Sequence, residues 1–525
     1  MFKEIKTDKE ARELMLSGMK KLATTVGATF GPNGASVVLC DIGKQPHVTK
    51  DGVSVAKEIE FDDPFENAGA QLLKEAAIRT VNTVGDSTTT ATILGYAFCV
   101  QLAQYLDKQP KVQFREEIER TKKAVVDFIK ANAIEITDAD IKNIATISAN
   151  NDPELGQLIA DAFLKVGRDG IITVEESKNA DTTIDIVSGM QFDRGYVSPH
   201  FVTDTTKDQC VLENPYVLIT EHKITRTRDL VGILNPVVEE GRPILIIAED
   251  YDDAVLEALK LNKLNGTLDC CAIKAPSYGE YRKKVLEDIA ILTGGFNVSY
   301  DSGLELVDAT NAILGSCKKV VVTKEKTTIT EGNGNADLIE SRITDLKAEY
   351  ERVKADPVQQ GGFVEKFLQE RIAKLTGGIC VIHVGGGTEL EMRERKDRVD
   401  DAVCATQAAI EEGIVPGGAT IYVRARKIIT REFGWGGYII QNVLRFPFEN
   451  LVITSGRDPE KYIDLVENNA GFDALRGCFV EDMIKVGIVD PAKAVRLAFE
   501  NAISIMLLFL NTDAIVAPKM AAQIV

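Results

Sequence analysis

The stretch Gly85-Asp86-Ser87-Thr88-Thr89-Thr90 lies between two segments with helical patterns. A glycine, a carboxylate and several hydroxyls at the start of a helix favour polyphosphate, because free N–H groups and the helix dipole attract anions there. The hydroxyls can donate to phosphate oxygens, and the carboxylate can hold Mg²⁺. The stretch is not a P-loop, since no Gly-Lys-Ser/Thr follows a glycine and a four-residue spacer. A threonine-rich helix N-cap accounts for the same residues, so the stretch alone leaves both interpretations open.

The bulk properties limit the class of protein. A chain of 525 residues with 45% hydrophobic and 27% charged residues is typical of a soluble protein of several domains. Its net charge of −18 argues against nucleic acid and against an anionic membrane as main partners. The nine cysteines show no paired metal spacing and the four histidines are far apart, which disfavours a zinc site. Residues 1–21 do not resemble a signal peptide, and the apolar stretch 505–510 is too short to span a bilayer, so we expect a reducing, cytoplasmic location.

The hydrophobic periodicity predicts a discontinuous organisation. Residues 1–130 are mostly helical, with helices over 10–26 and 67–84 and short strands over 36–39 and 47–49. In residues 188–377, apolar strands alternate with helices, which predicts βαβ units and a partly parallel sheet. The predicted strands cover 215–220, 243–248 and 270–275, and the predicted helices cover 229–240, 253–264 and 281–292. Helical character returns after residue 412, so the pattern predicts a mainly α outer domain around an inserted α/β domain.

Glycine and proline mark the transitions. Gly189, Gly377 and Gly378 lie near the change of character and are candidate hinges, although ordinary turn glycines explain each one singly. Asp490-Pro491 predicts the start of the last long helix, with the aspartate as N-cap and the proline at the first helical position.

Other charged and glycine-rich runs are candidates for chemistry. Lys50-Asp51-Gly52 is either a surface turn or the source of a second carboxylate for a metal. Asp400 and Asp401 point about 100° apart on a helix, so one of them can face a site, and a solvated face is the better interpretation for Asp400. Gly417-Gly418 allows close approach of a nucleotide or ends a helix. The mixed charges of residues 391–398 are typical of a solvated helix face.

Several runs, in one order and spacing, resemble the GroEL-type group I chaperonins across nearly the whole chain. They are Thr29-Phe30-Gly31-Pro32-Asn33-Gly34, Thr49-Lys50-Asp51-Gly52-Val53-Ser54-Val55, Gly85 to Thr90, Ile147-Ser148-Ala149-Asn150, Gly189-Met190-Gln191-Phe192-Asp193-Arg194-Gly195-Tyr196 and Glu411-Glu412-Gly413. The resemblance implies chaperonin architecture: an equatorial domain (1–130 and 412–525), an intermediate domain (131–187 and 378–411) and an apical domain (188–377). It also implies a homo-oligomeric ring of about seven subunits that hydrolyses ATP and encloses unfolded protein.

The resemblance also implies a nucleotide site. Asp401 matches the carboxylate that positions or activates the attacking water, with Asp51 as its catalytic partner, while Asp51 and Asp86 would hold Mg²⁺. Lys50 would lie near the phosphates and a monovalent cation, K⁺. The residues implied to surround the nucleotide are Thr29, Gly31, Pro32, Lys50, Gly52, Asp86, Ser87, Thr88, Thr89, Thr90, Gly418, Asp473, Ala474 and Asp490. Such a site suits phosphoryl transfer, which needs positioning, metal charge and an oriented water.

The resemblance further implies an apolar strip that captures unfolded or partly folded proteins, repeated around the ring. It maps onto Tyr196, His200, Phe201, Val231, Leu234, Leu256, Lys260 and Leu261. Without the resemblance, core positions of the α/β domain would be the better interpretation of these residues. A GroES-like co-chaperonin is a possible partner that the sequence leaves open.

The chain departs from the family pattern at some positions. Ser87 stands where the family usually has glycine, so its Cβ crowds the phosphate or its hydroxyl adds a contact. Asp473 replaces an asparagine near the base. Glu449 replaces an arginine that pairs across the interface between rings with an acid matched by Asp458, which predicts repulsion and a weakened double ring.

Rival functions fit less well. A small-molecule kinase would need a second basic constellation, and a group II chaperonin would need a long apical insertion; neither is evident. An ATP-binding ring scaffold without general folding activity is the remaining alternative.

Overall fold

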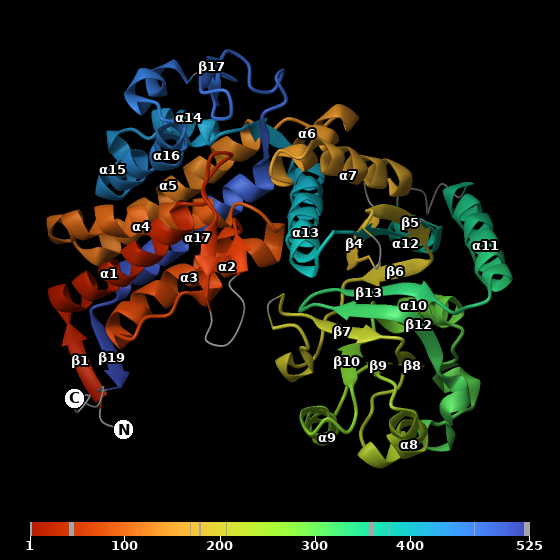
Figure 1. Cartoon of the computed structure of the whole chain (residues 1–525). Coiled ribbons are helices and arrows are strands. Elements are labelled where there is room, and N and C mark those ends of the chain that lie inside the picture. Colours follow the sequence, from red (N-terminus) through yellow and green to blue (C-terminus); the bar gives the residue numbers. More distant parts are fainter. Residues whose placement is uncertain are drawn as a thin grey trace. The chain divides into compact units, whose positions relative to one another are not determined.

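The computed structural model describes residues 3–40, 47–167, 170–177, 180–205, 207–355, 362–376, 378–466 and 468–518. The chain folds into two compact units (Figure 1). Unit 1 consists of residues 1–164, 176–182 and 384–525, and unit 2 of residues 165–175 and 183–383. Unit 1 is therefore discontinuous in sequence, and most of unit 2 is inserted within it.

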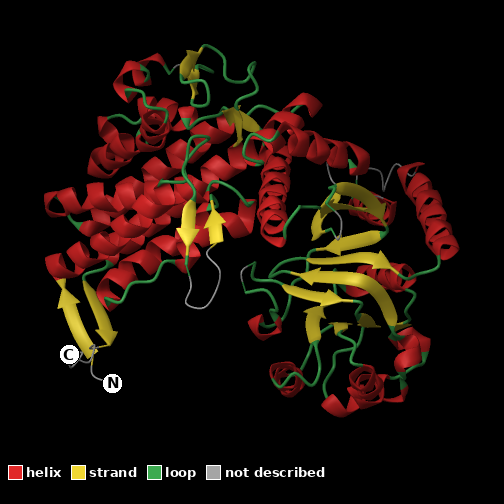
Figure 2. Cartoon of the chain, in the orientation of Figure 1, coloured by secondary structure: helices red, strands yellow, loops and turns green. Residues whose placement is uncertain are grey.

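Unit 1 is mainly helical (Figure 2). Its helices, with α7 crossing the edge of the unit, are α1 (Asp8–Gly27), α2 (Gly52–Glu58), α3 (Pro64–Val84), α4 (Thr88–Tyr105), α5 (Lys111–Ala131), α6 (Asp138–Ser148), α7 (Pro153–Val166), α13 (Glu389–Glu412), α14 (Thr420–Ala425), α15 (Gly434–Val443), α16 (Phe446–Thr454) and α17 (Ala492–Asn511). Short antiparallel pairs join distant segments: β1 (Lys3–Thr7) with β19 (Ala514–Pro518), β2 (Val37–Leu39) with β3 (His47–Thr49), β15 (Ile414–Pro416) with β18 (Val489–Pro491), and β16 (Gly471–Asp473) with β17 (Cys478–Val480).

Local sequence signals set the ends of α3, the helix before the phosphate-binding candidate. Asp63 caps it by accepting hydrogen bonds from the N–H groups of Phe65 and Glu66, and Pro64 occupies the first turn. Gly85 ends the helix in the left-handed conformation, with φ of 69°. The end of α3 thus turns the chain directly into α4.

The core of unit 1 is formed by helices α1, α3, α4, α5 and α17 packing on one another. In α17, eleven residues are buried, and Phe499 meets Phe98 of α4 edge to face at 6.1 Å between ring centroids. Among the described helices, α17 is the one whose length and composition would suffice to cross a membrane. Its packing against α3, α4 and α5 makes it the central core helix of the unit.

The predicted start of α17 is wrong in detail. The helix begins at Ala492, with Pro491 at the N-cap position, and Asp490 belongs to strand β18, where it pairs with Val415. Strand pairing holds the Asp490 backbone in an extended conformation, so its side chain is free to face another element.

Unit 2 is built on a mixed sheet (Figure 2). Its strand order is β10-β9-β8-β12-β13-β6, with β11 beside β8 and β7 beside β12, and a separate three-stranded sheet has the order β4-β14-β5. Strands β8, β9, β10 and β11 are parallel, as the alternation of strands and helices predicts. The strands are β4 (Ile171–Glu176), β5 (Thr183–Val187), β6 (Gly189–Phe192), β7 (Cys210–Glu213), β8 (Tyr216–Thr220), β9 (Ile244–Ala248), β10 (Cys270–Lys274), β11 (Asn297–Val298), β12 (Gly315–Val322), β13 (Thr327–Gly332) and β14 (Ile379–Val384).

Unit 2 also contains helices. They are α8 (Val231–Glu240), α9 (Asp253–Leu264), α10 (Gly279–Thr293), α11 (Ala336–Ala355) and α12 (Phe363–Thr376), with short 3-10 helices η2 (Pro199–Phe201) and η3 (Thr227–Leu230). Helices α10 and α12 contact the sheet. Arg371 of α12 and Arg342 of α11 both bond to the buried carboxylate of Asp288 on α10, at 2.6–2.8 Å, and so tie the three helices together.

The candidate hinge glycines differ in environment. At Gly189, a Cβ would lie 2.6 Å from the backbone oxygen of Ile329, so close packing in β6 requires glycine there. Gly378 has φ of +61°, which glycine adopts without strain. Gly377 lies outside the described residues. Whether any of them is a hinge stays a prediction.

Candidate functional site

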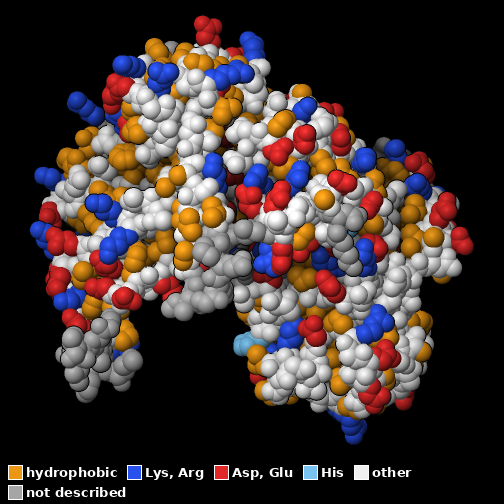
Figure 3. Space-filling view, viewed as in Figure 1, with side chains coloured by type: hydrophobic (Ala, Val, Ile, Leu, Met, Phe, Trp, Pro, Cys, Tyr) orange, Lys and Arg blue, Asp and Glu red, His pale blue; other side chains and the backbone are white. Residues whose placement is uncertain are grey.

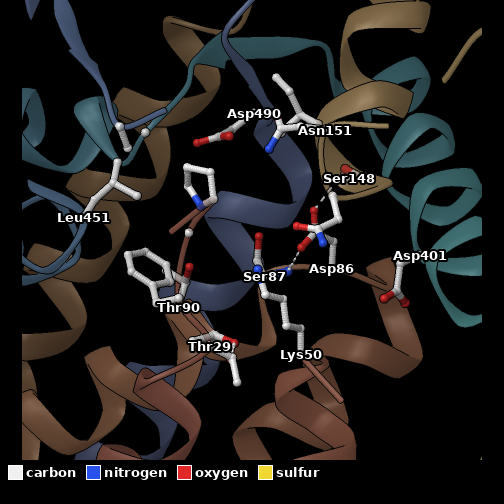
Figure 4. Close-up of a pocket in the computed structure, with 18 of the residues that line it drawn as sticks. Thr29, Lys50, Asp86, Ser87, Thr90, Ser148, Asn151, Asp401, Leu451 and Asp490 are labelled. Atoms are coloured by element: carbon white, nitrogen blue, oxygen red, sulfur yellow. Dashed lines mark hydrogen bonds between the residues drawn. The ribbon is translucent and has the colours of Figure 1, made fainter. Parts of the chain in front are cut away.

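A cavity of 540 Å³ lies within unit 1 (Figure 4). All the residues implied for the nucleotide site line it, although they come from seven separate stretches of sequence. These residues are Thr29, Gly31, Pro32, Lys50, Asp51, Gly52, Asp86, Ser87, Thr88, Thr89, Thr90, Asp401, Gly418, Asp473, Ala474 and Asp490. The fold therefore gathers the predicted groups around one space large enough for a nucleotide.

The N-terminus of α4 opens into this cavity. Ser87 precedes the helix in the left-handed conformation, with φ of 66°, and its side chain makes no capping hydrogen bond. The N–H groups at the start of α4 have no acceptor within the helix and carry the positive end of its dipole. Thr92, one turn further on, turns inward and bonds to the Thr88 carbonyl at 2.9 Å, so it belongs to the core. An anion is the natural ligand of such a terminus.

Asp86 is held from two sides. Its Oδ1 accepts a short hydrogen bond from the Ser87 N–H, and its Oδ2 accepts one from Ser148 Oγ of α6 at 3.3 Å (Figure 4). Burial raises the pKa of Asp86, and the Asp51 charge raises it further, while these two hydrogen bonds act in the opposite direction. The carboxylate is thus oriented but electrostatically uncompensated.

Asp51 caps helix α2 and also lines the cavity. Its Oδ1 and Oδ2 accept hydrogen bonds from Val53 N–H at 3.1 Å and Ser54 N–H at 2.9 Å, which caps α2. The next residue, Gly52, packs against α4, where a Cβ would lie 2.3 Å from Thr89 Oγ1. Glycine at position 52 therefore lets the Asp51 turn approach the start of α4.

Asp490 faces the same space from β18. It accepts hydrogen bonds from the backbone N–H groups of Gly418 and Ala419, which follow the paired strand β15. Burial, followed by the negative charge of Asp86, raises the pKa of Asp490 to about 7 despite those bonds. The two left-handed residues Gly418, with φ of 68°, and Ala419, with φ of 60°, present their N–H groups to the carboxylate.

Asp401 enters the cavity from α13, whereas Asp400 is not among the described residues that line it. Burial raises the pKa of Asp401 well above its ordinary value, and the charges of Asp51 and Asp86 raise it further. A raised pKa and several nearby carboxylates are typical of a site that a cation completes. Their close placement confirms only that these groups share one cavity, and their roles stay predictions.

The donor set fits Mg²⁺ bound together with phosphate. No group of three or more His, Cys, Asp or Glu side chains with metal-ligand geometry occurs among the described residues. Mg²⁺ commonly takes one or two carboxylates, with phosphate oxygens and waters as its remaining ligands. Asp51 and Asp86, which share the cavity with the α4 terminus, are suited to that arrangement.

Asp473 has a local structural role. Its Oδ1 accepts hydrogen bonds from the N–H groups of Leu475 at 2.9 Å and Arg476 at 3.0 Å, and the residue is 5% exposed. An asparagine oxygen could accept the same bonds, which explains why an aspartate is tolerated here. The adjacent Ala474 carbonyl accepts from Asn33 at 2.7 Å and fixes this loop to the segment that carries Thr29 and Gly31.

Other lining residues were not singled out as site residues from the sequence. Ser148 ends α6, and Asn150 and Asn151 lie in the turn between α6 and α7, where both asparagines have positive φ, of 62° and 61°. Backbone strain of this kind is enriched at functional sites. The run Ile147-Ser148-Ala149-Asn150 was the available signal, because it is one of the runs that resemble group I chaperonins. Glu394, Asp397 and Arg398 also line the cavity, so part of the charged run 391–398 is not a solvated face.

The residues implied for protein capture lie in unit 2. Val231 and Leu261 are 47% and 57% exposed, His200 is exposed, and Tyr196, Leu234, Leu256 and Lys260 are half-buried. Phe201 is different: it is fully buried in the core of the unit, so it is not part of an exposed strip. Helix η2 exposes His200 and turns the next side chain inward. Leu264 of α9, which the sequence did not indicate, is 66% exposed.

Figure 3 shows one face of the molecule in a space-filling view. On the face shown, acidic and basic side chains are interspersed over both units.

A helical unit with a carboxylate-rich cavity at a helix N-terminus and an inserted α/β unit define the chaperonin class. Residues 22–520 match the model of the TCP-1/cpn60 chaperonin family, and the chain belongs to that family. A solved structure with a similar fold is the chaperonin gp146 from the bacteriophage EL 2 (Pseudomonas aeruginosa), crystallised in the presence of ATP-BeFx. The two are 21% identical, the match covers 98% of this chain and 99% of that chain, and the TM-score is 0.70.

Proposed function

We propose that this chain forms an ATP-dependent ring that captures non-native proteins and encloses them for folding, driven by binding and hydrolysis of Mg-ATP. The observation that carries the proposal is the single cavity in which Lys50, Asp51, Asp86 and Asp401 meet the N-terminus of α4. Family membership and the crystallisation of gp146 in the presence of ATP-BeFx support the same choice of nucleotide. The ring is a homo-oligomer, a heptamer by the resemblance, and its location is cytoplasmic.

The proposed roles follow from the chemistry of each group. Free N–H groups and hydroxyls of Thr88, Thr89 and Thr90 donate to phosphate oxygens, and Lys50 offsets their charge. Asp51 and Asp86 would hold Mg²⁺, which would neutralise phosphate charge, and the segment that carries Lys50 would supply the site for K⁺. Asp401 accepts a proton from the attacking water and orients it.

The proposed domains are equatorial over 1–130 and 412–525, intermediate over 131–187 and 378–411, and apical over 188–377. Within the apical domain, exposed Val231 and Leu261 and the half-buried Leu234 and Leu256 supply apolar contact. Complete burial of one such side chain is worth about 1.5–3 kcal/mol, and repetition around a ring multiplies weak contacts.

The test of ATP turnover compares adjacent carboxylates. Asp401→Ala is expected to bind ATP normally and to lose most turnover, roughly 100-fold or more, because it removes the water-positioning group. Asp400→Ala is the matched control on the same helix and is expected to hydrolyse ATP at close to the normal rate. Normal turnover in Asp401→Ala would refute the assignment.

The test of capture uses the same preparation. Val231→Ser combined with Leu234→Ser is expected to abolish capture of a denatured model protein and leave ATP turnover unchanged. Leu338→Ser is the control, since Leu338 of α11 is 59% exposed but lies outside the proposed strip. If the unsubstituted protein hydrolyses ATP but captures no denatured protein, the alternative function, an ATP-binding ring scaffold without general folding activity, is supported instead.

A further inference from the structure

Helix α13 presents a charged face to the cavity. Glu394, Asp397, Arg398 and Asp401 all line it, and their spacing of three, four and seven residues places them on one side of a helix. Arg398 lies three residues, close to one turn, before Asp401. A displacement of α13 that changes the position of Asp401 therefore changes that of Arg398 as well.

The cavity carries many more acids than bases. Its basic lining residues among those described are Lys50, Arg398 and Arg476. Its acidic lining residues are Asp51, Asp86, Glu394, Asp397, Asp401, Asp473 and Asp490. A triphosphate bound in this cavity is repelled by the acidic residues and needs positive charge to offset that repulsion. Each basic side chain that reaches the triphosphate therefore contributes strongly to its binding.

The three basic residues are not equivalent. Arg476 pairs with Asp473 at 3.7 Å, and its side chain is 69% exposed, so it lies at the cavity margin. Lys50 comes from the segment before α2. Arg398 is the one of the three that shares a helix with Asp401, the proposed water-positioning carboxylate.

The guanidinium of Arg398 is anchored along one edge. Its Nε donates to Glu394 Oε1 at 3.0 Å, and Nη2 donates to the same oxygen. In the part of the chain that the structure describes, no hydrogen bond uses Nη1. Arg398 lines the cavity, and its side chain is 32% exposed. A planar group held along one edge is pre-organised to donate along the other.

We propose that Arg398 donates to the terminal phosphate of bound ATP and stabilises the charge that develops on it during hydrolysis. The inference rests on the proposed ATPase. In that step the water oxygen bonds to the γ-phosphorus while its proton passes to Asp401. The bond from the γ-phosphorus to the bridging oxygen breaks, and ADP leaves with the electron pair. Arg398 compensates the charge on the equatorial oxygens, as an arginine supplied within the same chain does in other phosphoryl transfers.

The main test is Arg398→Met, which keeps the aliphatic stem and removes the charge. Its kcat is expected to fall roughly 100-fold or more, with KM for ATP within about threefold of normal, because the contact strengthens in the transition state. Equilibrium binding of MgADP with aluminium fluoride, a mimic of that state, is expected to weaken by a similar factor, while binding of MgADP alone is unchanged.

Arg393→Met is the matched control. Arg393 lies on the same helix and pairs with Glu389 at 2.6 Å, but it is 62% exposed and does not line the cavity. It is expected to behave as the unsubstituted protein does. Should Arg398→Met fail to fold, Arg398→Lys carries the test, since it keeps the charge without the planar fork and is expected to lose about tenfold in kcat.

The outcomes separate the inference from the proposed function. If the unsubstituted protein hydrolyses ATP and Arg398→Met matches it in kcat and in fluoride-complex binding, the role of Arg398 is refuted and the ATPase stands. If the unsubstituted protein binds ATP but never hydrolyses it, both are refuted.

Discussion

Ser148 Oγ donates a hydrogen bond of 3.3 Å to Asp86 Oδ2, which joins the C-terminal end of α6 to the turn between α3 and α4. The two residues are 62 positions apart in sequence. Ser148 therefore orients the Asp86 carboxylate. The same hydrogen bond lowers the pKa of Asp86, which burial raises. The bond makes the position of α6 part of the geometry of the cavity.

Ser148→Ala is expected to weaken binding of Mg-ATP roughly tenfold or more, because a hydrogen bond to a charged group is worth about 1.5–3 kcal/mol. Loss of the bond also raises the pKa of Asp86 further, so the deficit is expected to be larger at pH 6 than at pH 8. Calorimetric titration at both pH values measures it.

Ser17→Ala controls for the loss of a serine–carboxylate hydrogen bond as such. Ser17 donates to Glu66 at 2.7 Å and does not line the cavity. Equal affinities for Ser148→Ala and Ser17→Ala at both pH values would show that the Asp86 contact has no part in binding.

Ser87→Gly separates the two interpretations of this departure from the family pattern. Left-handed backbone costs a residue with a Cβ about 1–2 kcal/mol, partly offset by the greater freedom of glycine in the unfolded chain, so a small rise in Tm is expected. If the hydroxyl contacts phosphate, affinity for ATP falls although Tm rises. Ser87→Ala keeps the Cβ without the hydroxyl, and affinity equal to the unsubstituted protein in both variants would exclude such a contact.

The sequence predicted the positions of helices and strands better than it predicted which of their side chains are buried or line the cavity. The expected strands 215–220 and 243–248 match β8 and β9 within one residue, because buried apolar runs between turns have a clear length and composition. Asp490 was misplaced because a standard helix-start pattern occurs one residue too early, where strand pairing with Val415 takes precedence. The lining role of Arg398 and the burial of Phe201 depend on which neighbour covers a given face, and a single sequence does not contain that information.

The acidity of the cavity predicts a dependence of stability on pH in the ligand-free protein. The pKa of Asp490 is raised to about 7 in the folded state, above its ordinary value of 3.8. Between these values the folded state binds more protons than the unfolded state, so this group's contribution to stability falls as pH rises from about 4 to 7. Asp490→Asn removes that loss, and its Tm relative to the unsubstituted protein is expected to be more favourable at pH 8 than at pH 5.

Asp482→Asn is the control, because the pKa of Asp482 is lowered, mainly by the Lys485 N–H, and the group is ionised at both pH values. Its effect on Tm is expected to be the same at pH 5 and pH 8. If Asp490→Asn raises Tm by the same amount or less at pH 8 than at pH 5, ionised Asp490 does not destabilise the folded protein.

Arg445 changes the expected electrostatics of the surface around Glu449. Its Nε bonds to Glu449 and its Nη2 to Glu460, so the charge of Glu449 is compensated within its own chain. The repulsion between Glu449 and Asp458 that the sequence predicts at the proposed contact between rings is therefore reduced. A weakened double ring stays a prediction. In this prediction, Arg445 reduces the repulsion between rings because it compensates the charge of Glu449.

Arg445→Met is accordingly expected to favour single rings over double rings, because it exposes two uncompensated carboxylates in every subunit. The shift is expected to be larger at about 20 mM than at about 500 mM salt. At high salt the Debye length shortens to a few ångströms, so the repulsion between these carboxylates is screened. Arg79→Met is the control, as Arg79 forms a comparable pair with Glu75 at 2.5 Å on an exposed part of α3. Sedimentation velocity over a range of protein concentrations measures the ratio of the two assemblies. The same ratio in Arg445→Met and Arg79→Met at low salt would show that the Glu449 region takes no part in the association of rings.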